Sequence, residues 1–285
     1  MPRRTIVALI VIVLVGSGAA AAYLTRDEGG PEEAIPTLQS GNRWSVPVNV
    51  TEYKFDTGAL NALPPGQAAF QVSVTGKEPH EFQIFRLADG VSYTEFQGVA
   101  LEKGRVPKLF SLADPVGGVG AGGGISPGGS GRVVLDLELG RYVFASFVGG
   151  DNAQGMIRPF DVLKGDEAPA GDPVTVGAMT IADGAFELPA DELSAGMYSV
   201  INQGGAAHEA AVFEVSDGVD ELIEDLQKND EAGGVAGLSA IGAGLSSYSE
   251  LALEPGSYAF VCRLTDPGTG EPYYSQGMVR EFEVR

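Results

Sequence analysis

The sequence is poor in the residues that cross-link exported domains or carry out most enzyme chemistry. Its 285 residues include one cysteine, Cys262, and two histidines, His80 and His208. A single cysteine has no partner for a disulfide within the chain, so disulfides do not hold this protein together. Two imidazoles in different parts of the chain also give little support to a catalytic triad of the serine or cysteine type.

Positive charge is also scarce. The chain has 18 lysines and arginines against 38 aspartates and glutamates, which gives a formal net charge of -20. Nucleic acid is repelled by such an acidic surface, so we expect no nucleic acid among the partners. Carboxylates are plentiful, yet no pair of them stands in a context that nominates a general acid and a base. We therefore do not expect an enzyme.

One long uncharged segment stands near the N-terminus. Residues 5–24 follow Arg3 and Arg4, and these 20 residues carry no charge. As a helix they would span roughly 30 Å, the thickness of a bilayer core. The arginines would keep the N-terminus in the cytoplasm, which favours an uncleaved transmembrane anchor over residues 1–25.

A cleaved signal peptide is the alternative, because the glycines and alanines of residues 16–22 resemble the end of such a peptide. Both interpretations export everything that follows. We therefore expect a single-pass protein of the cell membrane with extracytoplasmic domains, or otherwise a secreted protein. Residues 26–44 are polar and contain glycine and proline, which predicts a linker.

The rest of the chain is an internal duplication. Residues 48–91 align with residues 174–219, and the segments LELGRYVFAS and QGMIRPFDV reappear as LEPGSYAFVC and QGMVREFEV. The alignment predicts two homologous domains, domain 1 over residues 45–163 and domain 2 over residues 172–285. Residues 164–171 form the linker between them.

Each copy has the pattern of a β-sandwich. Segments such as AAFQVSVTG, HEFQIFRL and RYVFASFV are short, rich in valine, phenylalanine and tyrosine, and separated by turn residues. The fold class that we predict is all-β, with two tandem Greek-key sandwiches after an N-terminal hydrophobic helix. Tyr142 and Tyr258 follow a turn glycine, where such sandwiches often place a tyrosine corner.

Two kinds of segment depart from the strand pattern. Residues 217–230, DGVDELIEDLQKND, place apolar side chains at helical spacing between acids, which predicts a short surface helix. Residues 118–123 and 233–244 are glycine-rich and occupy the same place in the two copies. We interpret both as flexible crossover loops.

Each copy also has a histidine, then the motif G-x-Y-x-F-x-[C or S], and then a loop that ends in Gly-Met. This order resembles the cupredoxin family, the blue-copper fold of plastocyanin and azurin, over both domains. In that family two histidines, a cysteine and a methionine bind one copper ion, and this soft set of ligands suits copper. The matching residues are His80, Ser146 and Met156 in domain 1, and His208, Cys262 and Met278 in domain 2.

The ligand set is incomplete in both copies. In domain 1 Ser146 replaces the thiolate and the following loop has no histidine, so we expect its metal site to be lost. In domain 2 the loop again lacks a histidine, and Tyr273 stands about where one is expected. The resemblance therefore implies a partial metal site of His208, Cys262 and Met278, suited to Cu(I) more than to Cu(II).

We expect no cofactor in domain 2, with copper at this partial site as the alternative. Cys262 and Met278 are then core residues, since a buried free cysteine behaves as a small apolar side chain. Two functions remain open, of which we expect the first and keep the second as the alternative. The first is a membrane-tethered, extracytoplasmic, non-catalytic binding or structural module whose partner is a protein or small ligand outside the cell. The second is a copper-binding or electron-transfer protein that uses domain 2; the two-domain enzymes of this family need further histidines for their catalytic copper.

Overall fold

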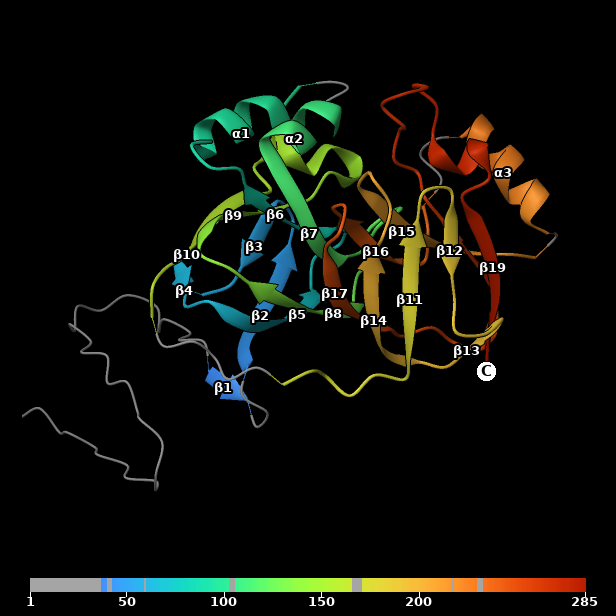
Figure 1. The fold of residues 1–285 in the computed structure, drawn as a ribbon, viewed down its shortest axis with the longest axis horizontal. Coiled ribbons are helices and arrows are strands. Elements are labelled where there is room, and N and C mark those ends of the chain that lie inside the picture. The colour runs from blue at the N-terminus through green and yellow to red at the C-terminus, as the bar shows by residue number, and fades with distance from the viewer. Residues whose placement is uncertain are drawn as a thin grey trace, which may run out of the picture. The chain divides into compact units, whose positions relative to one another are not determined.

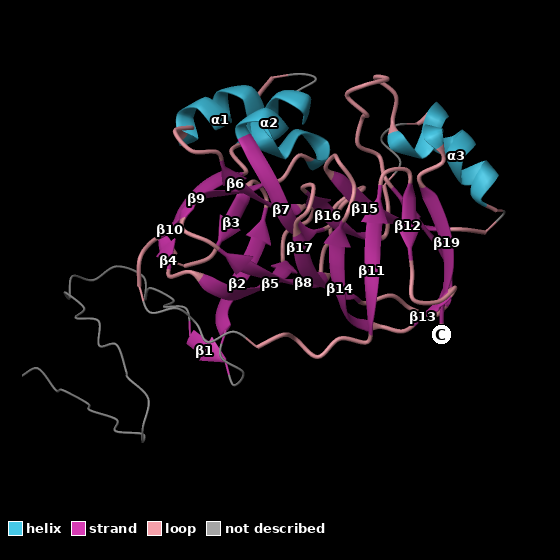
Figure 2. Cartoon of the chain, viewed as in Figure 1, coloured by secondary structure: helices cyan, strands magenta, loops and turns pink. Residues whose placement is uncertain are grey.

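Strands make up most of the regular structure in the computed structural model (Figure 2). The structure describes residues 37–39, 43–58, 60–102, 106–165, 171–216, 218–229 and 233–285. The predicted all-β fold class is confirmed. The segment predicted to be an anchor or signal peptide, residues 1–25, lies outside the described residues. Within the described ranges no helix is both long and apolar enough to cross a membrane.

We call residues 43–165 the first half and residues 171–285 the second half (Figure 1). Strand β1 (Thr37–Gln39) precedes the first half, so part of the segment predicted to be a linker is a strand. The first half contains β2 (Arg43–Thr51), β3 (Lys54–Asp56), β4 (Ala62–Leu63), β5 (Gly66–Val74), β6 (Phe82–Leu87), α1 (Tyr93–Ala100), α2 (Val106–Leu112), β7 (Ala113–Val119), β8 (Ser130–Leu137), β9 (Gly140–Ala145), the 3-10 segment η1 (Val148–Gln154) and β10 (Ile157–Val162).

The second half repeats this order, with one helix where the first half has two. It contains β11 (Gly177–Ala182), β12 (Ala185–Glu187), β13 (Glu192–Leu193), β14 (Gly196–Asn202), β15 (His208–Glu214), α3 (Val219–Lys228), β16 (Ala236–Ile241), β17 (Ser246–Leu251), β18 (Gly256–Val261), the 3-10 segment η2 (Tyr273–Gln276) and β19 (Val279–Val284). Each element of one half can therefore be compared with the element at the same place in the other.

The strands form two sheets, and both sheets run through both halves. One has the order β1-β2-β5-β8-β17-β14-β11-β12, with β3 paired to β2. The other has the order β13-β19-β18-β15-β16-β7-β6-β9-β10-β4. The halves meet where β8 pairs with β17 and where β7 pairs with β16, both antiparallel. In each sheet the two strands that meet occupy the same place in their own halves.

Each half has its own apolar core between the two sheets. One core gathers buried side chains from Val46 to Val162, and the other gathers side chains from Met179 to Val284. Alternation along a strand puts the tyrosine and phenylalanine of the repeated G-x-Y-x-F motif on the same, inward face. Stacked rings recur there: Phe144 lies 4.4 Å from Phe160, and Phe260 lies 4.3 Å from Phe282, between ring centroids.

The helices cover the outer face of the second sheet. In the first half Phe96 of α1 and Leu109 of α2 pack with Phe85 and Val143 of the strands below. In the second half Leu226 of α3 packs with strand residues of the same sheet. The predicted helix of residues 217–230 is confirmed as α3. Helices α1 and α2 were not predicted.

The glycine-rich segments are not simple loops, and this prediction was wrong in its main feature. Residues 236–241 form β16, which pairs with β7 of the other half. Beyond β7, the N–H of Gly120 donates to the oxygen of Gly237 at 2.9 Å. Gly122 has φ +83°, and a Cβ there would lie 2.4 Å from the Cβ of Ala211. Glycine is needed because the backbones of the two halves approach closely here.

The tyrosine corners are confirmed. The Tyr142 hydroxyl donates to the backbone carbonyl oxygen of Glu138 at 3.0 Å and accepts the backbone N–H of Glu138 at 3.1 Å. The Tyr258 hydroxyl donates to the oxygen of Glu254 at 2.9 Å. A third corner, formed by Tyr198 with Ser194, was not predicted from the sequence.

Candidate metal centre

The predicted ligands of the second half lie at the ends of three strands. His208 begins β15, Cys262 directly follows β18, and Met278 directly precedes β19. Because β15 and β18 are antiparallel neighbours, His208 and the end of β18 lie side by side. All three side chains are fully buried.

The structure brings the thiol and the imidazole together. Cys262 Sγ lies 3.6 Å from Nδ1 of His208. The other ring nitrogen, Nε2, lies 3.1 Å from Oδ1 of Asp183, in the turn between β11 and β12. With Nε2–H donating to the carboxylate, Nδ1 is bare and accepts the S–H proton of Cys262.

The thiol is neutral in the protein alone. Burial raises the pKa of Cys262 far above its ordinary value, and the carboxylate of Glu209 raises it further. The backbone N–H groups of Glu209 and Leu264 act against this, because they donate hydrogen bonds to the sulfur and lower its pKa. A bound cation would reverse the balance, since a coordinating thiol loses its proton outright.

Two further side chains complete the surroundings. The ring of Tyr273 lies edge-on to the imidazole of His208, with 4.5 Å between centroids and 67° between planes. Met278 belongs to the same core cluster as Cys262, and its backbone oxygen accepts the Cys262 N–H at 3.2 Å. Tyr273, which stands in the loop about where the family has its second histidine, therefore contacts the imidazole of His208.

The donor atoms of the second half fit a single soft ion. Two donors that bind one ion at about 2.0–2.3 Å each, in a tetrahedral arrangement, lie about 3.5 Å apart. The observed separation of Sγ and Nδ1 is 3.6 Å. Thiolate and imidazole are ligands that suit Cu(I), and a thioether adds to that preference. Among the described residues no group of three or more His, Cys, Asp and Glu side chains is placed to hold a metal.

The same position in the first half is closed by a carboxylate. Nδ1 of His80 lies 2.8 Å from Oδ2 of Asp151, and the Ser146 hydroxyl donates to that same oxygen at 2.5 Å. The N–H of Glu81 donates to the Ser146 oxygen at 3.0 Å. His80, Ser146 and Asp151 are all buried. A soft ion does not fit here, because the thiol is absent and the imidazole nitrogen is already bonded.

Sequence reasoning missed Asp151 and Asp183. A signal for Asp151 was present, because it lies five residues before Met156 as Tyr273 lies five residues before Met278. In both halves the residue at this position accepts the methionine N–H on its backbone oxygen at 3.1 Å. Asp183 lay in a turn of the strand pattern, and nothing in the sequence linked that turn to the histidine.

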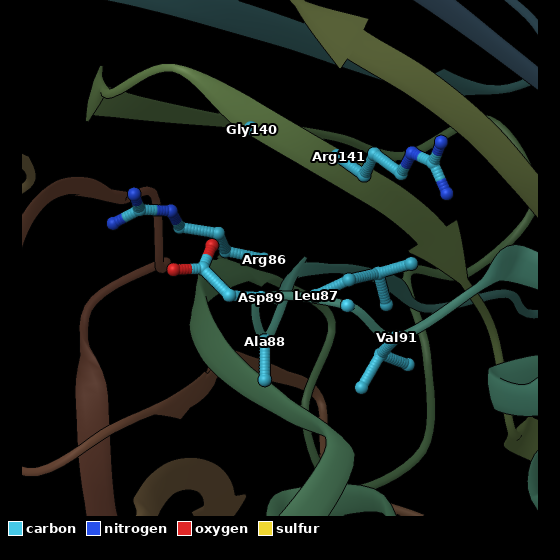
Figure 3. Close-up of a pocket in the computed structure, with 8 residues that line it drawn as sticks. Arg86, Leu87, Ala88, Asp89, Val91, Gly140 and Arg141 are labelled. Atoms are coloured by element: carbon cyan, nitrogen blue, oxygen red, sulfur yellow. The ribbon is translucent and has the colours of Figure 1, made fainter.

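A surface pocket of about 380 Å³ lies elsewhere, in the first half (Figure 3). It is lined by residues 86–91 with Gly140 and Arg141. The guanidinium groups of Arg86 and Arg141 point to opposite sides of it (Figure 3). Arg86 is already paired with Glu138. None of the predicted metal ligands lines this pocket, and its charges do not converge on one point.

No protein-family model matches the chain, and no curated protein matches it. The solved structures to which it is similar include a reduced auracyanin from Roseiflexus castenholzii, 18% identical, covering 40% of this chain and 99% of its own, with a TM-score of 0.28. A multicopper oxidase is 12% identical and covers 89% of this chain and 94% of its own, with a TM-score of 0.26. The copper-containing nitrite reductase NirK from Thermus scotoductus SA-01 is 11% identical and covers 85% and 61%, with a TM-score of 0.25.

The TM-scores of these similarities are all below 0.3. The β-sandwich described above is therefore derived from the two sheets of this chain and not from those structures. The roles of His208, Cys262 and Met278 depend on the geometry of this chain and not on its similarity to those structures.

Proposed function

We propose that this chain is a non-catalytic tandem cupredoxin-like protein whose second half binds one Cu(I) ion and whose first half binds none. Residues 45–163 and 172–285 are then its two domains. The observation that carries the proposal is the 3.6 Å separation of Cys262 Sγ and His208 Nδ1, with Nε2 occupied by Asp183.

Cys262 and His208 would hold the ion, with Met278 as the third candidate ligand. Copper would supply a soft one-electron centre at the end of β18. Burial of the three side chains keeps water from the ligands. Glu209 and Leu264 donate backbone hydrogen bonds to the sulfur, which stabilise the thiolate once its proton has left.

The N-terminal sequence supports a place outside the cytoplasm. We propose that residues 1–25 tether the acidic halves to the outer face of a cytoplasmic membrane, and that their partner is a protein or small ligand there. Intact-mass measurement of the mature protein separates an anchor from a cleaved signal. A product that begins near Ala22 would remove the anchor and leave export in place.

The test is a titration of the full-length chain with Cu(I) in competition with a chromogenic chelator. We expect one equivalent to bind to the wild type and none to Cys262→Ser, which carries the residue that the first half already has. With Cu(II) we expect no intense blue absorption, because the second imidazole is missing. A strong blue band in the wild type, or full Cu(I) binding by Cys262→Ser, would contradict the proposal.

A matched pair of variants tests the methionine. Met278→Leu should weaken Cu(I) binding, because the thioether is lost while the buried volume is nearly conserved. Met156→Leu makes the same change at the same place in the first half and should leave binding unchanged. Equal affinities for the two variants would restrict the ligands to Cys262 and His208.

A metal-free binding or structural module is the second candidate. The observation that favours it is the first half, where His80, Ser146 and Asp151 form a buried hydrogen-bonded network without a metal ligand set. Absence of Cu(I) binding in the titration would make this the leading function.

A further inference from the structure

The two histidines of this chain bond carboxylates through opposite ring nitrogens. His208 reaches Asp183 through Nε2, at 3.1 Å. His80 reaches Asp151 through Nδ1, at 2.8 Å. A carboxylate only accepts hydrogen bonds, so the bonded nitrogen carries the proton in each case. The ring nitrogen that does not contact the carboxylate is therefore Nδ1 in His208 and Nε2 in His80.

The carboxylate of Asp183 is held in position by its turn and by a backbone hydrogen bond. It occupies the two-residue turn between β11 and β12, where Ala182 and Ala185 form the last strand pair. The N–H of Gly205 donates to both of its carboxylate oxygens, at 3.0 Å each. His208 reaches Oδ1 of the same carboxylate, so the hydrogen bonds from Gly205 hold in place the group that the imidazole contacts.

The first half has a carboxylate at the corresponding turn, but it is used differently. Glu52 follows Thr51, which forms the last strand pair with Lys54, so Glu52 corresponds to Asp183. Its side chain accepts the N–H of Lys77. Nε2 of His80 is buried and has no hydrogen-bond partner among the described residues. Nε2 of the histidine is thus hydrogen-bonded in the second half and has no partner among the described residues in the first.

We propose that Asp183 is a positioning residue for the metal centre: it holds the imidazole proton of His208 on Nε2 and so keeps Nδ1 bare towards Cys262. This inference rests on the proposed function, because a bare Nδ1 matters only if a metal binds there. A carboxylate that accepts a hydrogen bond from the second ring nitrogen of a ligating histidine fixes the tautomer and the orientation of that ring. In the first half Asp151 holds the proton on Nδ1, which denies that nitrogen to a metal.

Imidazole nitrogen NMR of the metal-free, full-length chain tests the tautomers directly. With two histidines in the chain, a His80→Gln variant assigns both sets of signals. We expect the proton on Nε2 of His208 and on Nδ1 of His80. In Asp183→Ala we expect the His208 signals to shift towards a mixture of tautomers, and in Asp183→Asn, whose amide oxygen can still accept, to stay as in the wild type. A proton on Nδ1 of His208 in the wild type would overturn the inference without any variant.

Cu(I) competition then tests the consequence. Loss of such a positioning group typically costs 10–100-fold in metal affinity, and we expect a loss of about that size in Asp183→Ala. Asp183→Asn should retain most of the affinity. Glu52→Ala is the matched control, because it removes the corresponding carboxylate of the other half, and should leave both the affinity and the His208 signals unchanged.

The two failures are distinguishable. If the wild type binds no Cu(I), the proposed function fails, and the nitrogen spectrum still decides the tautomer. If the wild type binds Cu(I) while Asp183→Ala keeps both its affinity and its His208 tautomer, the proposed function stands and the role of Asp183 is overturned.

Discussion

The residue at one position of the loop before the methionine contacts the histidine in each half, and it differs between the halves. It lies five residues before the methionine of each half, where the first half has Asp151 and the second has Tyr273. Asp151 bonds the nitrogen that would face a metal. Tyr273 only packs its ring edge against the imidazole and leaves both nitrogens to other partners. The same backbone position therefore closes one site and leaves the other open.

The variant Tyr273→His should turn the second half into a blue-copper site. It adds the second imidazole to a set that already has a thiolate, one imidazole and a methionine, which is the composition of such sites. We expect intense visible absorption with Cu(II) where the wild type has none. The control is Tyr274→His, since Tyr274 belongs to the cluster on the other side of the sheet. Equal absorption from both variants would show that the position of the new imidazole does not matter.

At the scale of elements, the turns before β9 and β18 are both tyrosine corners, but they differ in their hydrogen bonds. The Tyr142 hydroxyl both donates to and accepts from the backbone of Glu138. The Tyr258 hydroxyl donates to the oxygen of Glu254, and Pro255 follows Glu254 in the sequence. The first corner thus has two hydrogen bonds across the turn.

Removing the hydroxyls one at a time measures these corners. Tyr142→Phe should lower the free energy of unfolding by about 1–2 kcal/mol, because two hydrogen bonds are lost, and Tyr258→Phe by about 1 kcal/mol. Denaturant unfolding of the full-length variants gives both values. A larger loss in Tyr258→Phe than in Tyr142→Phe would contradict the expectation that the loss follows the number of hydroxyl hydrogen bonds.

The elements also show where prediction from sequence succeeds. Strands, tyrosine corners and the corresponding positions of His80 and His208 followed from period-two alternation and from the repeat. Helix α1 could have been found, because Ser92 caps it by accepting the N–H of Glu95, and S-x-x-E is a known start signal. Strands β7 and β16 could not have been found, because their glycine-rich sequences are typical of loops. They are strands because each pairs with the other across the two halves. Asp183 was missed for a similar reason, because its partner is 25 residues away.

On the scale of the whole molecule, the two halves share both sheets. They fall within one compact unit, Glu33–Arg285. The junction between them includes backbone hydrogen bonds such as that from Gly234 to the oxygen of Gly122, at 2.7 Å. Side-chain contact adds to it, because Arg263 of the second half donates to the same oxygen at 2.8 Å. We therefore expect the halves to unfold together.

Two unique residues report on the halves separately: Trp44 by fluorescence in the first, and Cys262 by thiol labelling in the second. Their denaturation midpoints should coincide. Gly122→Ala should lower both by the same amount, because φ +83° is strained by about 1–2 kcal/mol and the new Cβ meets Ala211. Gly128→Ala is the control, with φ +79° and no atom within 4 Å of its new Cβ, so it should cost the backbone strain alone. A shift confined to Trp44 would contradict the shared unfolding.

The shared sheets also limit what evolution could remove after the duplication that we propose. Deleting either half would leave β7 and β8, or β16 and β17, as unpaired strand edges. Such edges recruit strands from other chains and lead to aggregation. On the same proposal, the first half lost a thiol ligand and kept its fold, because Asp151 links His80 and Ser146 in its place. The proposed duplication thus left selection free to discard a metal site but not the half that had carried it.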